Sequence, residues 1–496
     1  MSIAILRSRA QIGTAAPPVT IEVFLSGGLP AFSIVGMAET AVRESKDRVR
    51  GALLSSGFRF PQERITVSLG PADMRKTGGR FDLAVALGIL AASRQIDAAA
   101  TNDYEFFGEL ALNGALRPVP GMLPAALRAA EDGKSIVVPE ANAAEAALVS
   151  SDVYAAASLL EVTSHLVAET PIGARARTRP ELNGQCVADI ADVRGQPGPK
   201  RALEVAAAGG HNLLMVGPPG TGKSMLASRL PGLMPPMTER EAIETASIDS
   251  VLGNEPDLEH WRSRPFRSPH HTATAASLVG GGSEPRPGEI SRAHNGVLFL
   301  DELPEFSRSV LEVLREPIEA GRITISRAAR QTDFPARFQL VAAMNPCPCG
   351  YLGDLAADCG CSAERVAAYR ARISGPLLDR IDLHVTVGRP PRELLRGPIE
   401  QAESSMAVRE RVTAARERQL ERQGVSNAML SGADLETFCD LDETGWALLD
   451  RAADKFAFSV RSYQRVLRVS RTIADLHGAE RITPPQIAEA LGLRGC

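Results

Sequence analysis

Hydrophobic and polar positions alternate along the first third of the chain in a pattern that predicts an α+β unit. Short apolar runs typical of strands, such as Ile21 to Phe24, are separated by alanine-rich stretches of helical length, such as Asp82 to Ala92. From Glu169 to Gln185 arginine, threonine, proline and glycine occur without apolar periodicity, as is typical of a linker. We therefore predict a first domain over residues 1–166 and a linker over residues 167–186.

After the linker, short β runs alternate with helix-like segments. The runs are Asn212 to Val216, Gly296 to Leu300 and Gln339 to Ala343, and this alternation is expected of parallel strands that are joined by crossover helices. Towards the C-terminus the sequence becomes helical and charged. The pattern predicts an α/β domain with a parallel sheet over residues 187–390 and a helical domain over residues 391–496.

Composition and charge narrow the classes of function. The chain has 496 residues, of which 44% are hydrophobic and 23% charged, so it is globular and long enough for several domains. The net charge of −4 argues against coating nucleic acid through bulk positive charge, so any DNA contact must be local. Arg7 and Arg9 interrupt the first apolar run, and no other run approaches the length of a membrane helix. We expect a cytoplasmic protein with reduced cysteines and no membrane contact.

A glycine-rich loop is the strongest chemical signal. It follows the apolar strand Leu213 to Val216 and leads into a helical stretch, the context that separates a phosphate-binding loop from an ordinary glycine–proline turn. In such a loop the lysine reaches the β and γ phosphates and the serine ligates Mg²⁺. The predicted ATP- and Mg²⁺-binding residues are Gly217, Pro218, Pro219, Gly220, Thr221, Gly222, Lys223 and Ser224.

A buried-type strand from Gly296 ends in two acids, Asp301 and Glu302. A carboxylate at this position can bind Mg²⁺, and a second one can polarise the attacking water. An acidic pair at a strand end is common by itself. Here it indicates a metal site because a phosphate-binding loop precedes it in the chain. We predict that Asp301 is a metal ligand and that Glu302 distinguishes a hydrolase from a nucleotide-binding switch.

These motifs resemble the AAA+ branch that contains magnesium chelatase motors and MCM helicases. The resemblance includes Asn345 after the strand Gln339 to Ala343, and the segment Leu377 to Asp382. Further blocks are similar to the ComM/YifB family of magnesium-chelatase-like proteins; they span Arg267 to Thr272, Asn345 to Gly350, Ser374 to Leu383 and Arg468 to Leu476.

The resemblance implies a P-loop AAA+ core with a C-terminal helical lid, assembled as a homo-hexamer that binds ATP between subunits. Asn345 would be the first sensor, Arg380 an arginine finger for the neighbouring subunit, and Arg461 in the lid the second sensor. Each role is chemically reasonable, because phosphoryl transfer requires a placed water and positive charge. For a lone arginine, the alternative is a surface salt bridge.

The first domain resembles the Lon protease domain, with a ribosomal S5 domain 2-like fold. The likeness lies in Pro71 to Asp82 and Gly108 to Gly121. Arg80 stands where Lon-type enzymes have the nucleophilic serine, and Leu123 stands where they have the lysine base. Neither side chain can supply that chemistry, so we expect no peptidase activity.

Two groups of potential metal ligands remain. Cys347-Pro-Cys349 and Cys359-Gly-Cys361, with nine residues between them, could form a structural Zn²⁺ site, although free structural thiols are the alternative. His270 and His271 are adjacent, so they cannot form a two-ligand face, and packing or hydrogen bonding is the expected role.

The family resemblance implies a DNA helicase or translocase that acts on single-stranded or branched DNA. It would promote branch migration of recombination intermediates in homologous recombination and natural transformation. From the residues alone, Gly321 to Gln331 predicts a hairpin with Arg322, Arg327 and Arg330 available for phosphates, or else a solvated edge hairpin. The alternative function is a magnesium-chelatase-like or MoxR-like remodelling ATPase that acts on a protein partner.

Overall fold

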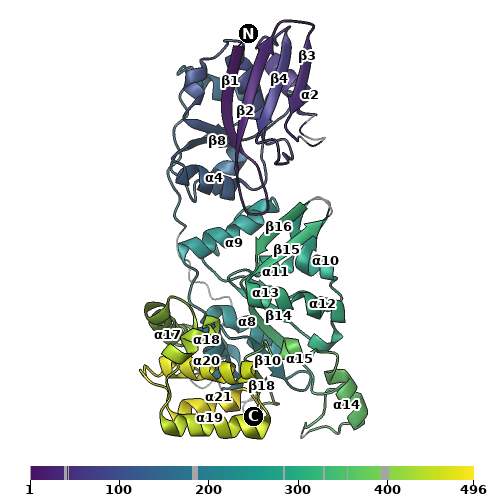
Figure 1. Cartoon of the computed structure of the whole chain (residues 1–496), viewed down its shortest axis with the longest axis vertical. Helices are drawn as coiled ribbons and strands as arrows, with labels where there is room; N and C mark the ends of the chain where they lie inside the picture. Colours follow the sequence, from purple (N-terminus) through teal and green to yellow (C-terminus); the bar gives the residue numbers. More distant parts are fainter. Residues whose placement is uncertain are drawn as a thin grey trace. The chain divides into compact units, whose positions relative to one another are not determined.

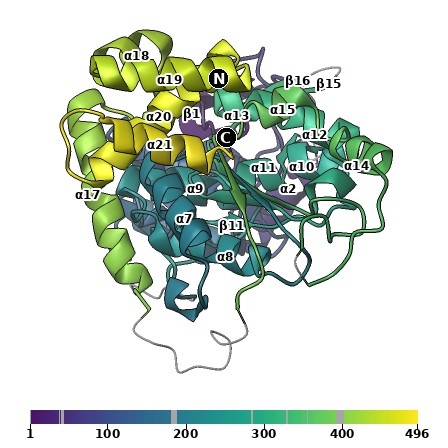
Figure 2. The same cartoon turned by 90° about the horizontal axis from the view of Figure 1, so that it is seen from below.

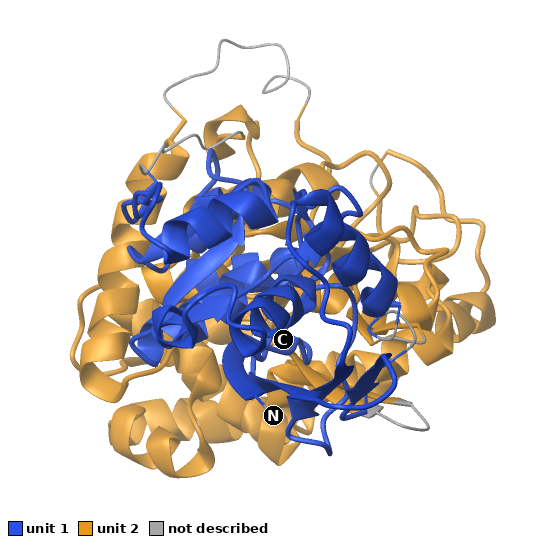
Figure 3. Cartoon of the chain, turned by 90° about the horizontal axis from the view of Figure 1, so that it is seen from above, with its two compact units in different colours: residues 1–182, 242–261 blue, residues 183–241, 262–496 orange. Residues whose placement is uncertain are grey.

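The computed structural model describes the chain as two compact units (Figures 1 and 3). One unit comprises Met1–Leu182 and Ala242–Trp261, and the other comprises Asn183–Glu241 and Arg262–Cys496. Ala242–Trp261 lie within the range predicted for the ATPase domain but pack with the first unit. The described residues are 2–37, 39, 42, 44–180, 188–282, 285–327, 330–354, 356–391 and 402–495; residues 181–186 of the predicted linker lie outside them.

The first unit contains a four-stranded sheet in the order β1-β2-β4-β3. Its strands are β1 (Ser2–Arg9), β2 (Pro18–Ser26), β3 (Ala31–Val35) and β4 (Arg64–Gly70). Helix α3 (Asp82–Ala92) packs on this sheet and is buried over its whole length, which explains why it lacks a polar face. Gly88 permits the close approach, because a Cβ there would lie 2.5 Å from Val23 Cγ2. Helix α2 (Ser45–Ser55) packs against α3.

The remainder of the first unit is built on a three-stranded parallel sheet in the order β5-β8-β9. Its elements are β5 (Tyr104–Phe106), β6 (Glu109–Leu110), β7 (Leu116–Arg117), α4 (Met122–Glu131), β8 (Ser135–Pro139), α5 (Ala143–Ala146), β9 (Val153–Ala156) and α6 (Leu159–Leu166). The end of helix α9 (Glu239–Val251) also belongs here, since the Ser250 carbonyl accepts a 2.8 Å hydrogen bond from the Gly121 N–H.

The second unit is centred on a five-stranded sheet in the order β11-β14-β17-β10-β18. All neighbouring strands are parallel, as the alternation of β runs and helices predicts. The strands are β10 (Leu213–Val216), β11 (Phe266–Arg267), β14 (Val297–Leu300), β17 (Gln339–Met344) and β18 (Leu383–Thr386). Helices α7 (Pro197–Gly209) and α8 (Lys223–Leu233) pack together beside this sheet. Because the strands are parallel, the loops after β10, β14 and β17 leave from one edge.

Two small antiparallel ribbons interrupt the α/β pattern. They are β12 (Gly280–Gly281) with β13 (Arg286–Pro287), and β15 (Arg322–Arg327) with β16 (Arg330–Pro335), the hairpin that the sequence predicts. The ribbons are in contact, since a Cβ at Gly280 would lie 3.0 Å from Ile325 Cδ1. The neighbouring helices are α10 (Ala275–Val279), α11 (Glu289–Arg292), α12 (Arg308–Val313) and α13 (Arg315–Ala320).

The C-terminal part of the second unit is helical, as predicted (Figure 2). Its helices are α17 (Ser405–Gln423), α18 (Gly432–Phe438), α19 (Glu443–Phe456), α20 (Val460–Leu476) and α21 (Pro484–Leu493). Two short helices, α14 (Ala363–Arg370) and α15 (Gly375–Leu378), precede β18 within the range predicted for the ATPase domain. Helix α21 packs against α19 and α20. Among the described helices, none combines the length and the apolar character that a membrane crossing requires.

A buried acid connects this helical part to the sheet. Asp382, directly before β18, is ion-paired with Arg465 of α20 and accepts a 3.0 Å hydrogen bond from the Asn212 N–H before β10. Its Oδ2 lies 3.6 Å from Nδ1 of His211. Burial alone would raise the pKa of Asp382, but the nearby His211 ring and the charge of Arg465 hold it well below the usual value.

Candidate nucleotide-hydrolysis site

The phosphate-binding loop connects β10 to α8, as the sequence predicts. Gly220 and Gly222 have φ values of +76° and +90°, a region that residues with a side chain rarely adopt. Gly217 is required for a different reason, because a Cβ there would lie 2.1 Å from the Val387 carbonyl oxygen. The loop therefore directs its backbone towards the N-terminus of α8, where N–H groups are free to bind an anion.

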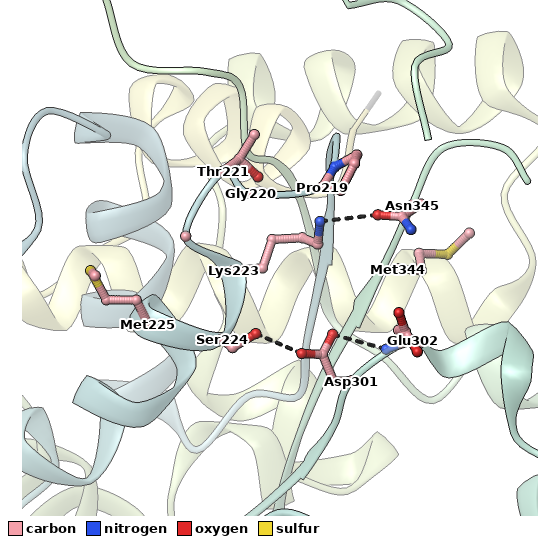
Figure 4. Close-up of a pocket in the computed structure, with 11 residues that line it drawn as sticks. Pro219, Gly220, Thr221, Lys223, Ser224, Met225, Asp301, Glu302, Met344 and Asn345 are labelled. Carbon is pink, nitrogen blue, oxygen red and sulfur yellow. Dashed lines mark hydrogen bonds between the residues drawn. The ribbon is translucent and has the colours of Figure 1, made fainter. Parts of the chain in front are cut away.

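Lys223 is buried at the start of α8 and lies inside this loop (Figure 4). Its Nζ donates hydrogen bonds to the carbonyl oxygens of Gly217 at 2.8 Å and Pro218 at 2.9 Å, and to Asn345 Oδ1 at 3.2 Å. Burial lowers the pKa of Lys223, while the charges of Asp301 and Glu302 raise it. A phosphate beside this amine would favour its charged form.

Asp301 and Ser224 face each other across the pocket. The Ser224 hydroxyl donates a 2.6 Å hydrogen bond to Asp301 Oδ2, so two hard oxygen groups of the kind that Mg²⁺ prefers are already adjacent. Glu302 follows with φ +53°, and its N–H donates a 2.9 Å hydrogen bond to Asp301 Oδ1. This left-handed backbone is uncommon for a residue with a side chain and is typical of functional sites.

These residues enclose a pocket with a volume of about 390 Å³, within the usual size range for small-molecule sites. The phosphate-binding loop, Asp301, Glu302 and Asn345 meet there, although they lie on three different strand ends (Figure 4). The lining residues are Pro219, Gly220, Thr221, Gly222, Lys223, Ser224, Met225, Asp301, Glu302, Met344 and Asn345. The arrangement can hold a triphosphate and Mg²⁺, with a carboxylate and an amide nearby to orient a water.

The segment that carries the four cysteines, residues 346–361, is called the cysteine loop. It begins directly after Asn345 and packs against the phosphate-binding loop. Gly350 has φ +87°, and a Cβ there would lie 2.7 Å from Pro219 Cδ and 3.8 Å from Asn345 Cγ. The cysteine loop thus restrains both Asn345 and the phosphate-binding loop, a connection that the sequence analysis did not predict.

The four cysteine sulfur atoms converge. Those of Cys347, Cys349, Cys359 and Cys361 all lie within 4.8 Å of one another. Three of the separations are 3.4, 3.7 and 3.6 Å. A zinc ion bound to four thiolates at about 2.3 Å keeps the sulfur atoms about 3.8 Å apart, so the spacing fits a tetrahedral metal site.

Of the predicted ATP-binding residues, Gly217 and Pro218 do not line the pocket, and neither do two of the predicted catalytic residues, Arg380 and Arg461. Arg380 is buried and forms an ion pair with Glu319, with Nη2 2.5 Å from Oε1, and it donates a 2.6 Å hydrogen bond to the Pro376 carbonyl. Arg461 is exposed in the first turn of α20. Within one chain, neither arginine is part of the lining around Lys223.

In the first unit, Arg80 and Leu123 are both buried. Arg80 donates hydrogen bonds to the carbonyl oxygens of Arg9 and Pro120, and burial lowers its pKa to about 10. The Leu123 N–H donates to Glu145 Oε1 at 3.1 Å and to Ser250 Oγ of α9 at 3.2 Å. At the positions where Lon-type enzymes have the serine and the lysine, this chain therefore has side chains that pack or form hydrogen bonds.

A parallel sheet with a phosphate-binding loop, an acidic strand end and a polar residue directly after the strand between them is the arrangement of a P-loop ATPase of the AAA+ kind. Sequence profiles agree with this class. The profile described as magnesium chelatase, subunit ChlI, matches residues 189–403. The profiles described as subunit ChlI of Mg-chelatase and as the ChlI C-terminal region match residues 21–142 and 402–494.

Individual relatives specify the family. The chain is 51% identical over 500 residues to competence protein ComM of Haemophilus influenzae, covering 100% of this chain and 98% of the relative. It is 46% identical to YifB of Escherichia coli, covering 100% and 97%. The 38 kDa magnesium-chelatase subunit of Cereibacter sphaeroides is 24% identical over 58% of this chain and 85% of its own length. The chain belongs to the ComM/YifB family of magnesium-chelatase-like AAA+ ATPases.

Proposed function

We propose that this ATPase is a DNA helicase or translocase that promotes branch migration of recombination intermediates. The ATP-hydrolysing part of this proposal is supported by the composition of one pocket. The groups that meet there are those of Lys223, the Ser224–Asp301 pair, Glu302 and Asn345. The likeness to a protein named for competence supports a role in homologous recombination and natural transformation.

Each group in the pocket has a proposed task. Lys223 and the loop N–H groups would bind the phosphates of ATP. Ser224 and Asp301 would hold Mg²⁺, which neutralises phosphate charge when it is bound. Glu302 would accept a proton from the attacking water, and Asn345 would orient that water.

The proposed assembly is a homo-hexamer with Arg380 and Arg461 acting as arginine finger and second sensor. To act on ATP that is bound to a neighbouring subunit, the Arg380 guanidinium must first separate from Glu319. Glu319 is half-exposed, so its carboxylate regains water when the pair opens, which limits the cost of release.

The β15–β16 hairpin supports the DNA part of the proposal. One face is apolar and buried through Ile323, Ile325 and Phe334. The opposite face is exposed at Arg322 and Ser326. Arg327 and Arg330 pair across the strands at the hairpin end, but their side chains lie outside the described residues. A polar face with an exposed arginine suits contacts with the phosphates of a strand in a ring channel.

Unwinding of a labelled four-way junction tests this function. The purified protein is expected to convert the junction to duplex products with ATP, whereas Lys223→Ala is inactive. Arg322→Ala should keep its ATPase rate without DNA but lower the slope of log affinity against log salt by about 1, because one phosphate contact is lost. An active ATPase that DNA does not stimulate, and that leaves the junction intact, would instead favour the remodelling of a protein partner.

We also propose that the four cysteines bind a structural Zn²⁺. Protein purified under reducing conditions without chelator is expected to contain one zinc per chain, and Cys359→Ser should lose it and unfold at a lower temperature. Cys439→Ser is the matched control, since Cys439 is buried apart from the cluster and should leave the zinc content unchanged. Metal analysis that finds no zinc in the wild-type protein would exclude the site.

A further inference from the structure

Asp382 binds two different parts of the second unit, one through each carboxylate oxygen. Its Oδ2 accepts the hydrogen bond from the Asn212 N–H directly before β10, whereas its Oδ1 is ion-paired with Arg465 of α20. The side chains are 5% exposed for Asp382 and 13% exposed for Arg465. Water therefore screens this pair far less than a pair on the surface.

The segment that carries Asp382 also carries the proposed arginine finger. Arg380 lies two residues earlier, and its backbone carbonyl accepts a 2.9 Å hydrogen bond from Asn212 Nδ2. Asn212 thus binds Arg380 through its side chain and Asp382 through its N–H. The backbone at Arg380 cannot shift relative to β10 without breaking these bonds.

The other side of the carboxylate faces the helix that carries the proposed second sensor. Arg461 lies in the first turn of α20, four residues before Arg465. Residues at this spacing are neighbours on one face of a helix. The ion pair with Asp382 therefore holds the helical turn that presents Arg461.

A second contact joins the same segment to the same helical turn. Arg494 Nη1 donates hydrogen bonds to the carbonyl oxygens of Ile381 at 3.3 Å and of Asp382 at 3.2 Å. Its Nη2 donates a 3.0 Å hydrogen bond to Oγ of Ser462, the residue next to Arg461. Two arginines thus connect the first turns of α20 to the residues directly after Arg380.

We propose that Asp382 is a positioning residue that fixes Arg380 and Arg461 relative to each other. While its ion pair is intact, α20 and the segment of Arg380 move together. A change that bound ATP causes at Arg461 would therefore reach the arginine that is offered to the neighbouring subunit. The inference rests on the roles proposed above for these two arginines.

ATPase kinetics of the full-length protein test this coupling. Asp382→Asn keeps the shape of the side chain but loses the charge that pairs with Arg465. We expect kcat to fall about 10- to 100-fold, the effect of a small misplacement of the groups around the reacting phosphate. Binding of a fluorescent ATP analogue should be unchanged, because Lys223 and its loop are left intact.

A double variant separates positioning from stability. Asp382→Asn alone leaves the Arg465 charge without its partner and should lower the unfolding temperature. Adding Arg465→Met removes that charge as well, so the unfolding temperature should recover while kcat stays low. If kcat recovers together with the unfolding temperature, the ion pair is only structural and the proposal is wrong.

Asp475→Asn is the matched control. Asp475 is a buried acid in the last turn of α20, where it is ion-paired with Arg422 and Arg471. Its replacement should lower the unfolding temperature but not the kcat of the folded protein. An equal fall of kcat in Asp382→Asn and Asp475→Asn would show a general loosening of the lid and would contradict the proposal.

The arginine variants separate this inference from the proposed function. Arg380→Ala and Arg461→Ala test the two arginines themselves. If both variants are inactive while Asp382→Asn keeps the wild-type kcat, the proposed function stands and the coupling is wrong. If either arginine variant hydrolyses ATP like the wild type, the role proposed for that arginine is wrong and the coupling fails with it.

Discussion

Replacing Arg380 with alanine is expected to lower the ATP hydrolysis rate of the assembled protein by about 10³- to 10⁵-fold, the range for loss of an arginine finger. The guanidinium would otherwise stabilise the charge that develops on the transferred phosphoryl group in the neighbouring subunit. Steady-state phosphate release at a protein concentration that supports assembly measures the effect.

Two controls distinguish this role from a structural one. Glu319→Gln weakens the ion pair that holds Arg380 within the single chain. If that pair only positions the arginine before assembly, the Glu319→Gln variant should retain most of the ATPase activity. Mixing Arg380→Ala with Lys223→Ala should restore activity, because some interfaces then combine an intact Lys223 with an intact Arg380. If Glu319→Gln is as inactive as Arg380→Ala, and mixing restores nothing, Arg380 is structural.

Glu302→Gln is expected to reduce kcat by about 10²- to 10⁴-fold, the contribution of a general base. Glutamine has the same shape but cannot accept the proton from water, so ATP binding should persist. Phosphate release and the retention of a fluorescent ATP analogue measure the two properties separately.

Lys223→Ala provides the contrast, because it removes the cation that reaches the phosphates and should therefore lose binding as well as hydrolysis. Lys223 has backbone carbonyl and amide partners in the structure, so its loss leaves no buried charge unpaired.

An unchanged hydrolysis rate in Glu302→Gln would contradict the role of Glu302 as the base. That result would favour a scaffold protein that only binds nucleotide.

Many of the site residues could be predicted because each motif consists of residues that are close together in the chain. The glycines of the phosphate-binding loop, the strand before it and the helix after it are consecutive in the chain, so their spacing already specifies the backbone shape. The strands ending at Asp301 and Asn345 were predicted from buried apolar runs. Parallel strands place their carboxyl ends at one edge, so the convergence of these residues followed from the fold class.

The partners of the site residues could not be predicted in this way. Glu319 beside Arg380, His271 beside Glu302 and Gly350 against Pro219 depend on strand order and on the paths of loops between distant segments. The short strand Phe266–Arg267 carries too few residues to show a periodicity, so nothing in the sequence placed His271 next to the acidic strand end.

The sequence by itself determined the chemistry of this protein: a phosphate-binding loop, an acidic strand end and a four-cysteine loop, each specified by residues close together in the chain. Only the tertiary structure decided how that chemistry is restrained. It pairs Arg380 with Glu319, joins Glu302 to His271 and places Ala242–Trp261 in the first unit. The physical reason is that hydrophobic periodicity records which face of an element is buried, but not which distant side chain it meets there.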